Sequence, residues 1–181
     1  MNSAIFDFFG VNKAWDKVTD ILLCTILAVF AVFGIMGIVQ LVKRKNIIKV
    51  DKELVCMIPI LILMVIIYAV FNKIWIINYR PVLIDGVAEV SFPSSHVLAS
   101  FTLSLMMMIA LPKYIEKKKR RIVIDVMLGL LVAAIAFGRV ASGMHWFSDV
   151  CGGIVFGIIL VVTYVVILRK SDKGVAKEKD R

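Results

Sequence analysis

The residues best suited to chemistry in this chain are its two histidines, His96 and His145, which lie beside long apolar stretches. Imidazole is costly in hydrocarbon and rare there without a function, so two of them at the edges of apolar segments predict one reaction centre. Serines, prolines, cations and a carboxylate accompany them at fixed spacings. These neighbours are Lys73, Arg80, Pro81, Pro93, Ser94, Ser95, Arg139 and Asp149.

The first polar group follows the second apolar stretch. Six residues separate Lys73 from Arg80, and Pro81 comes next. This spacing predicts two cations about two helical turns apart, which could bind one anion together. Structural roles are the alternative: Lys73 could extend its ammonium to the membrane surface, and Arg80 could cap a backbone carbonyl.

The second group, which ends at His96, directly precedes the third apolar stretch. Proline followed by serines is typical of a helix start, and the N-terminus of a helix offers unpaired N–H groups and a positive dipole to an anion. We therefore expect Ser94 and Ser95 to hold phosphate through backbone amides and hydroxyls, with His96 directed at the same place. The alternative is a simple helix cap with an incidental histidine.

The third group consists of Arg139, His145 and Asp149, with five and then three residues between them. On one helical turn, Asp149 could accept a hydrogen bond from one ring nitrogen of His145 and leave the other as a lone-pair donor. That arrangement suits a nucleophile and its orienting partner, although a structural role is the alternative. We expect no metal, because zinc-binding cysteines or a His-Glu-x-x-His pattern are missing and nearby cations oppose a dication.

Apolar stretches approaching twenty residues recur along the chain, whose mean hydropathy is +0.94. A bilayer core takes about 20 helical residues to cross, and helices satisfy their own backbone hydrogen bonds in lipid. We predict an all-α, polytopic membrane bundle over residues 1–170 and a charged cytoplasmic tail over 171–181. The five predicted transmembrane segments are 21–42, 54–71, 97–111, 122–137 and 150–168.

The cations predict the orientation of the bundle. Of the 22 Lys and Arg residues, seventeen fall in segments 43–53, 113–121 and 169–181, on one face of the predicted bundle. Because cytoplasmic loops are enriched in Lys and Arg, we expect a cytoplasmic C-terminus and both histidines on the extracytoplasmic face of the cell membrane. The net charge of +9 then reflects topology and membrane lipids, and we expect no nucleic-acid partner.

Two further features concern helix placement. Residues 1–20 mix aromatic and aliphatic side chains with charges, which predicts a helix lying at the membrane interface. They lack the basic start and small-residue cleavage site of a secretory signal, so we expect the first transmembrane segment to be retained. Gly153 and Gly157 form a Gly-x-x-x-Gly pair in the last segment, which predicts close approach of another helix.

Taken together, the three groups resemble the signature of the type 2 phosphatidic acid phosphatase superfamily, the membrane lipid phosphate phosphatases. The resemblance covers residues 73–149. The family usually has glycine where Ser95 stands and serine where Gly138 stands, and its members often have six transmembrane helices rather than five.

The resemblance implies a metal-free phosphatase with no cofactor, in which His145 attacks phosphorus, Asp149 stabilises the imidazolium and His96 handles the leaving-group proton. Lys73 and the two arginines would bind phosphate. It also implies an amphiphilic lipid substrate, with undecaprenyl diphosphate preferred and phosphatidylglycerophosphate or phosphatidate as alternatives. A non-catalytic protein that binds or transports lipid phosphates is the alternative from another class. The sequence predicts no oligomeric state.

Overall fold

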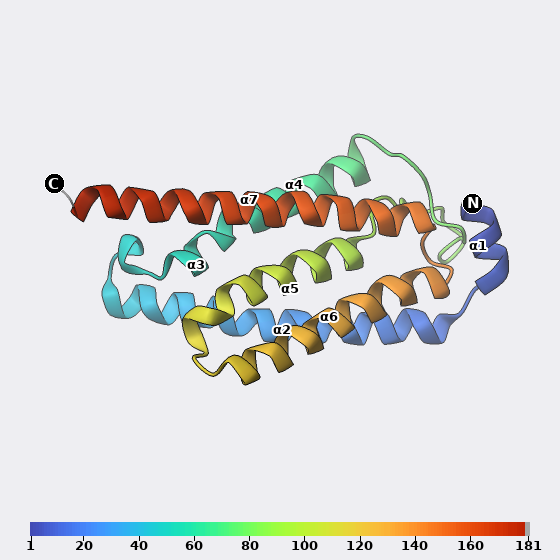
Figure 1. Ribbon diagram of the computed structural model, residues 1–181. Helices are drawn as coiled ribbons and strands as arrows, with labels where there is room; N and C mark the ends of the chain where they lie inside the picture. The colour runs from blue at the N-terminus through green and yellow to red at the C-terminus, as the bar shows by residue number, and fades with distance from the viewer. Residues whose placement is uncertain (180–181) are drawn as a thin grey trace.

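The computed structural model describes residues 1–179, with side chains placed as far as residue 172, so residues 180–181 of the predicted tail lie outside the described residues. The chain folds into a bundle of helices (Figure 1). In order they are α1 (Asn2–Phe9), α2 (Lys13–Arg44), the short 3-10 helix η1 (Ile47–Lys49), α3 (Lys52–Val55), α4 (Met57–Lys73), α5 (Ser95–Tyr114), α6 (Lys118–Ala141) and α7 (Phe147–Lys179).

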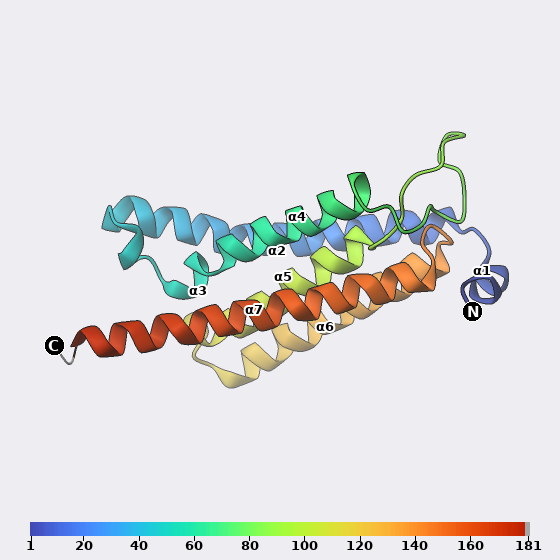
Figure 2. The same ribbon diagram turned by 90° about the horizontal axis from the view of Figure 1, so that it is seen from above.

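Five helical segments within the described chain are long and apolar enough to cross a membrane, which confirms the predicted all-α polytopic fold. Each predicted transmembrane segment lies inside one of these candidate spans, and the second span combines α3 and α4. Both ribbon views place α1, the loop 74–94 and the turn 142–146 at one end of the bundle, called the site end below, while α7 ends at the other (Figures 1 and 2).

Helix α5 forms the centre of the bundle. It packs against α7, α6 and α2, and it is the most buried of the five long helices. Its mean hydropathy is also the lowest of the five, and it buries the hydroxyls of Ser100, Thr102 and Ser104. Both properties have one cause: α5 faces other helices rather than lipid, so small polar side chains can take the place of large apolar ones.

The close approach of α7 to α5 depends on glycine. A Cβ atom built on Gly153 would lie 3.0 Å from the Ser94 carbonyl oxygen and 3.0 Å from Val97 Cβ, and one on Gly157 would lie 2.7 Å from the ring of Phe101. The predicted helix contact at this Gly-x-x-x-Gly pair is confirmed. Because Ser94 belongs to the second polar group, this contact also positions a candidate site residue.

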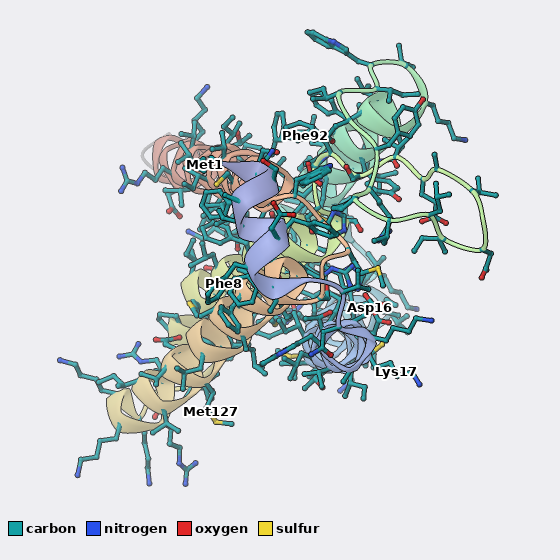
Figure 3. All side chains as sticks on the ribbon, turned by 90° about the vertical axis from the view of Figure 1, so that its right-hand side faces the viewer. Met1, Phe8, Asp16, Lys17, Phe92 and Met127 are labelled. Atoms are coloured by element: carbon teal, nitrogen blue, oxygen red, sulfur yellow. The ribbon has the colours of Figure 1, made fainter. Side chains whose placement is uncertain are left out.

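The N-terminal segment differs from the sequence prediction of one interfacial helix over residues 1–20. Only α1 is separate: it lies across the site end, where Asn2 Nδ2 donates to Ser148 Oγ at 2.8 Å (Figure 3). Helix α2 already starts at Lys13, because the side chain of Asn12 accepts hydrogen bonds from Ala14 N and Trp15 N. Residues 13–20 therefore extend the first transmembrane helix into the site end.

We expect Gly153→Ala to destabilise the protein. Overpacking an interior contact costs about 1–3 kcal/mol, which lowers Tm by about 2–4 °C per kcal/mol in a protein of this size. Gly129→Ala is the matched control, because a Cβ there meets nothing within 4 Å. Thermal unfolding in detergent measures both, and an equal Tm for the two variants would contradict the close α5–α7 contact.

Candidate active site

The second polar group starts helix α5, as the proline and serines predict. Ser94 occupies the N-cap position of α5, and its backbone N–H donates to the carbonyl oxygen of Asp149 at 3.0 Å. This hydrogen bond joins the second polar group to the third. The N-terminus of α5 thus lies beside the start of α7, and a helix N-terminus favours an anion.

His145 and Asp149 form the predicted pair at the start of α7. His145 lies in the turn between α6 and α7, and its Nδ1 is 3.4 Å from Oδ2 of Asp149. This distance is longer than a well-formed hydrogen bond. The carboxylate of Asp149 is completely buried, so it needs other donors. Trp146 N donates to Oδ2 at 3.0 Å, and the amide of Asn78 donates to Oδ1 at 2.9 Å.

Asn78 is a site residue that the sequence analysis missed. It belongs to the loop 74–94, and its side-chain oxygen accepts a hydrogen bond from Ser91 Oγ at 2.8 Å. Asn78 therefore fixes one edge of the Asp149 carboxylate to this loop. Its position two residues before Arg80 is the only signal in the sequence that could have drawn attention to it.

Arg139 is the most buried cation of the site, with 2% of its side chain exposed. It lies near the end of α6 and faces α2, where its Nη1 is 2.6 Å from Asp16 Oδ1 and 3.1 Å from Thr19 Oγ1. Asp20 lies 3.8 Å from the same nitrogen and 2.8 Å from Nε2 of His96. A single polar network therefore contains His96 and Arg139.

The two α2 carboxylates, Asp16 and Asp20, were also missed, because residues 1–20 were assigned to the interface. Figure 3 views the site end and shows Asp16 on α2 where this helix enters the site. The spacing of four residues between Asp16 and Asp20 places both on one face of a helix. That spacing would have been informative only if the first transmembrane helix had been extended back to Lys13.

The spacing of the first polar group suggested one continuous helix, which the structure does not contain. Helix α4 ends at Lys73 and the following loop is irregular, so Arg80 is not two helical turns from Lys73. Arg80 Nε lies 3.0 Å from Glu89 Oε2, and its backbone N–H donates to the Glu89 carbonyl at 2.9 Å. Lys73 is exposed, and its ammonium contacts no carboxylate in the part of the chain that the structure describes.

Ser95, the other predicted phosphate ligand, is the first residue of α5. Its side chain lines a small apolar cavity of about 180 Å³ together with residues of α4, among them Met64 and Tyr68. Ser95 therefore lies beside α4. Its backbone N–H remains at the helix N-terminus, where the sequence analysis expected it to contribute.

Unpartnered polar atoms concentrate in this region. Among the described residues, ten buried side-chain nitrogen or oxygen atoms have no hydrogen-bond partner, and six belong to the predicted site. One of the six, Arg80 Nε, still contacts Glu89 as an ion pair, and the other five lie on Ser94, His96, Arg139 and His145. Buried polar groups are nearly always satisfied, so such a cluster of donors indicates a binding site for a polar ligand. The six atoms are Arg80 Nε, Ser94 Oγ, His96 Nδ1, Arg139 Nε, His145 Nδ1 and His145 Nε2.

His145 is neutral at physiological pH. Burial lowers the pKa of its imidazole to about 4, and the nearby charges of Arg139 and Arg80 act in the same direction. Asp149 raises this pKa and offsets part of the effect. Since only the neutral imidazole carries a lone pair, His145 can act as a nucleophile or base in neutral solution.

The structure is a bundle with five helical segments long and apolar enough to cross a membrane, and one end of it buries His145, Asp149 and Arg139 close together. The model of the PAP2 superfamily matches residues 54–173, which is more than half of the chain. The chain belongs to the PAP2 superfamily. This result confirms the resemblance seen in the three polar groups.

Two individual proteins are similar to the chain. Lipid phosphate phosphatase delta of Arabidopsis thaliana is 30% identical over 98 residues, which cover 53% of this chain and 24% of that longer protein. A crystal structure described as the first transmembrane PAP2 type phosphatidylglycerolphosphate phosphatase from Bacillus subtilis superposes with a TM-score of 0.70. The match covers 93% of this chain and 85% of that chain at 15% identity, and it shows that the two share a fold.

We expect His145 to titrate with a midpoint near pH 4 rather than at the ordinary 6.5. In a His96→Gln variant carrying a histidine-free tag, His145 is the remaining histidine, so imidazole NMR signals in detergent report it alone. Because the unfolded state binds this proton first, the free energy of unfolding should also decrease as pH falls from 6.5 toward 4. A midpoint at 6.5 would contradict the buried environment.

Proposed function

We propose that the protein is an integral membrane phosphatase that hydrolyses a phosphate monoester or diphosphate of a membrane lipid through a phosphohistidine intermediate. The observation that carries this proposal is the neutral, buried imidazole of His145, held near Asp149 and close enough to Arg139 and Arg80 to feel their charges. Buried atoms of Arg139 and Ser94 have no hydrogen-bond partner among the described residues. A phosphoryl group needs its charge held while a nucleophile approaches in line, and these residue types supply both requirements.

In the first step, Nε2 of His145 forms a bond to phosphorus and the bond between phosphorus and the lipid oxygen breaks. His96 gives its proton to that oxygen, so the lipid alcohol, or lipid monophosphate, leaves with this oxygen protonated. The positive charge that develops on the His145 ring is stabilised by the carboxylate of Asp149, 3.4 Å from Nδ1. The product of this step is phosphohistidine at position 145.

In the second step, water attacks phosphorus while His96, now neutral, accepts a proton from it. The nitrogen–phosphorus bond breaks, inorganic phosphate is released and His145 recovers its lone pair. Lys73, Arg80, Arg139 and the amides of Ser94 and Ser95 would hold the phosphate oxygens through both steps. These cations fill the role that a magnesium pair has in other phosphoryl-transfer enzymes, so the reaction needs no metal.

The substrate is amphiphilic in this proposal. The candidate site lies where the apolar helices end, so a head group can reach it while the lipid tail stays among the helices. The uneven distribution of Lys and Arg supports an extracytoplasmic site and a cytoplasmic C-terminus. We place undecaprenyl diphosphate first, as the family resemblance of the three polar groups implies. The structural neighbour described as a phosphatidylglycerolphosphate phosphatase supports that lipid as second candidate.

We expect purified protein in detergent to release inorganic phosphate from a panel of undecaprenyl diphosphate, phosphatidylglycerophosphate and phosphatidate. His145→Ala should lose this activity by a factor of about 10⁴ or more, because it removes the nucleophile. An unchanged Tm shows that the variant is folded. Near-normal turnover by the folded variant would refute the assignment, and a wild type that binds the lipids without turnover would favour a binding or transport protein.

We expect full activity after dialysis against EDTA. Within the described part of the chain, no three His, Cys, Asp or Glu residues are arranged to hold a metal ion, and three cations contribute positive charge instead. The measurement compares kcat with and without the chelator and after addition of Mg²⁺ or Zn²⁺. Loss of activity that a metal restores would contradict the metal-free mechanism.

A further inference from the structure

The helix α2 brings two carboxylates into the site that belong to none of the three polar groups. Asp20 Oδ1 lies 2.8 Å from Nε2 of His96, and Asp16 Oδ1 lies 2.6 Å from Nη1 of Arg139. The two contacts divide the site: Asp20 meets the histidine assigned to proton transfer, whereas Asp16 meets a cation assigned to phosphate binding. Each α2 carboxylate therefore has a separate partner.

The approach of α2 depends on the missing side chain at Gly138. A Cβ atom at this position would lie 2.4 Å from Thr19 Cγ2 and 3.2 Å from Trp15 Cε3, so a larger residue would force these α2 side chains or the helix itself to move. The family usually has serine here. In this chain, the hydroxyl of Thr19 accepts a hydrogen bond from Arg139 at 3.1 Å, so α2 supplies the polar contact that residue 138 lacks.

Backbone contacts of the α1–α2 linker also fix the position of α2 along its own helix axis. The backbone N–H of Asn12 donates to the Ser142 carbonyl at 3.0 Å, which ties the α1–α2 linker to the turn before His145. At Gly143, φ is +69° and a Cβ would lie 2.3 Å from the Gly10 carbonyl oxygen, so only glycine allows this contact. The position of Asp20 is thus coupled to the segment that carries the nucleophile.

We propose that Asp20 is a positioning residue for His96 in the reaction described under Proposed function, on which this inference rests. The carboxylate accepts a hydrogen bond from Nε2–H and thereby fixes the ring and its tautomer. The other ring nitrogen, Nδ1, is buried without a partner among the described residues. It donates the proton to the leaving oxygen and then accepts one from the attacking water, while the Nε2–H bond to Asp20 stays in place.

Charge supports the same assignment. Asp16 and Asp20 face His96 from α2, and Arg139 faces it from α6. Burial and the arginine both oppose a positive charge on His96, so an imidazolium there needs a carboxylate in contact with it. Asp20 supplies that contact from a side chain that is 54% exposed. Replacing such an exposed residue by its amide changes stability little.

The test compares leaving groups. We expect Asp20→Asn to lower kcat for phosphatidate in detergent micelles by about 10- to 100-fold, because an alkoxide must be protonated as it leaves. With p-nitrophenyl phosphate, whose leaving phenolate is a stable anion, the loss should stay below about threefold. His96→Ala should show the same dependence on the leaving group, and the double variant should be no slower than His96→Ala alone.

Two matched variants complete the test. Asp16→Asn removes a carboxylate one turn earlier on α2, and it should affect both substrates equally, because its partner Arg139 binds phosphate in either case. Asp7→Asn removes an exposed carboxylate of α1 that forms no ion pair with any described residue, and it should leave both rates unchanged.

Equal losses on both substrates for Asp20→Asn, a gain in rate, or additive effects with His96→Ala would each overturn the positioning role. Failure of the proposed function has a different signature. In that case wild-type protein shows no turnover that depends on His145 with p-nitrophenyl phosphate or with any lipid of the panel described under Proposed function, and both proposals fall together.

Discussion

The buried carboxylate of Asp149 is the interaction on which the rest of the site depends. Its main-chain carbonyl accepts from Ser94 at the start of α5, and its side chain accepts from Asn78 and Trp146 while lying near His145. A fully buried charge is tolerated only with such partners, and breaking one buried pair costs about 3–5 kcal/mol. Three segments that are distant in sequence are therefore held in register by one residue.

The sequence predicts much of this arrangement because a bilayer imposes strong local rules. The length of the apolar segments predicts where the transmembrane helices lie, and the excess of Lys and Arg in some loops distinguishes the two ends of the bundle. The spacing of His145 and Asp149 is equally local, since four residues along a helix start bring two side chains together. Ser94 at the N-cap agrees with residue preference, although its side chain makes no cap hydrogen bond. These parts needed no knowledge of how helices pack.

The remaining parts depend on tertiary contacts that no local pattern encodes. The loop containing Asn78 and Arg80 takes its shape from hydrogen bonds to distant residues rather than from helical spacing. Asp16 and Asp20 looked like the polar half of an interfacial helix, because their partners lie more than 70 residues away in sequence. The absence of a side chain at Gly138 has meaning only once α2 is known to lie against it.

The central position of α5 has a consequence for biogenesis. A translocon sorts each segment by its partition free energy, and hydroxyl-bearing residues such as Ser100, Thr102 and Ser104 make that free energy less favourable. During synthesis, α5 emerges before its main neighbours α6 and α7 exist. Until α6 and α7 are synthesised, α2 is the main neighbour that can stabilise α5 in the bilayer. The helix that carries His96 is therefore the one least able to insert into a bilayer alone.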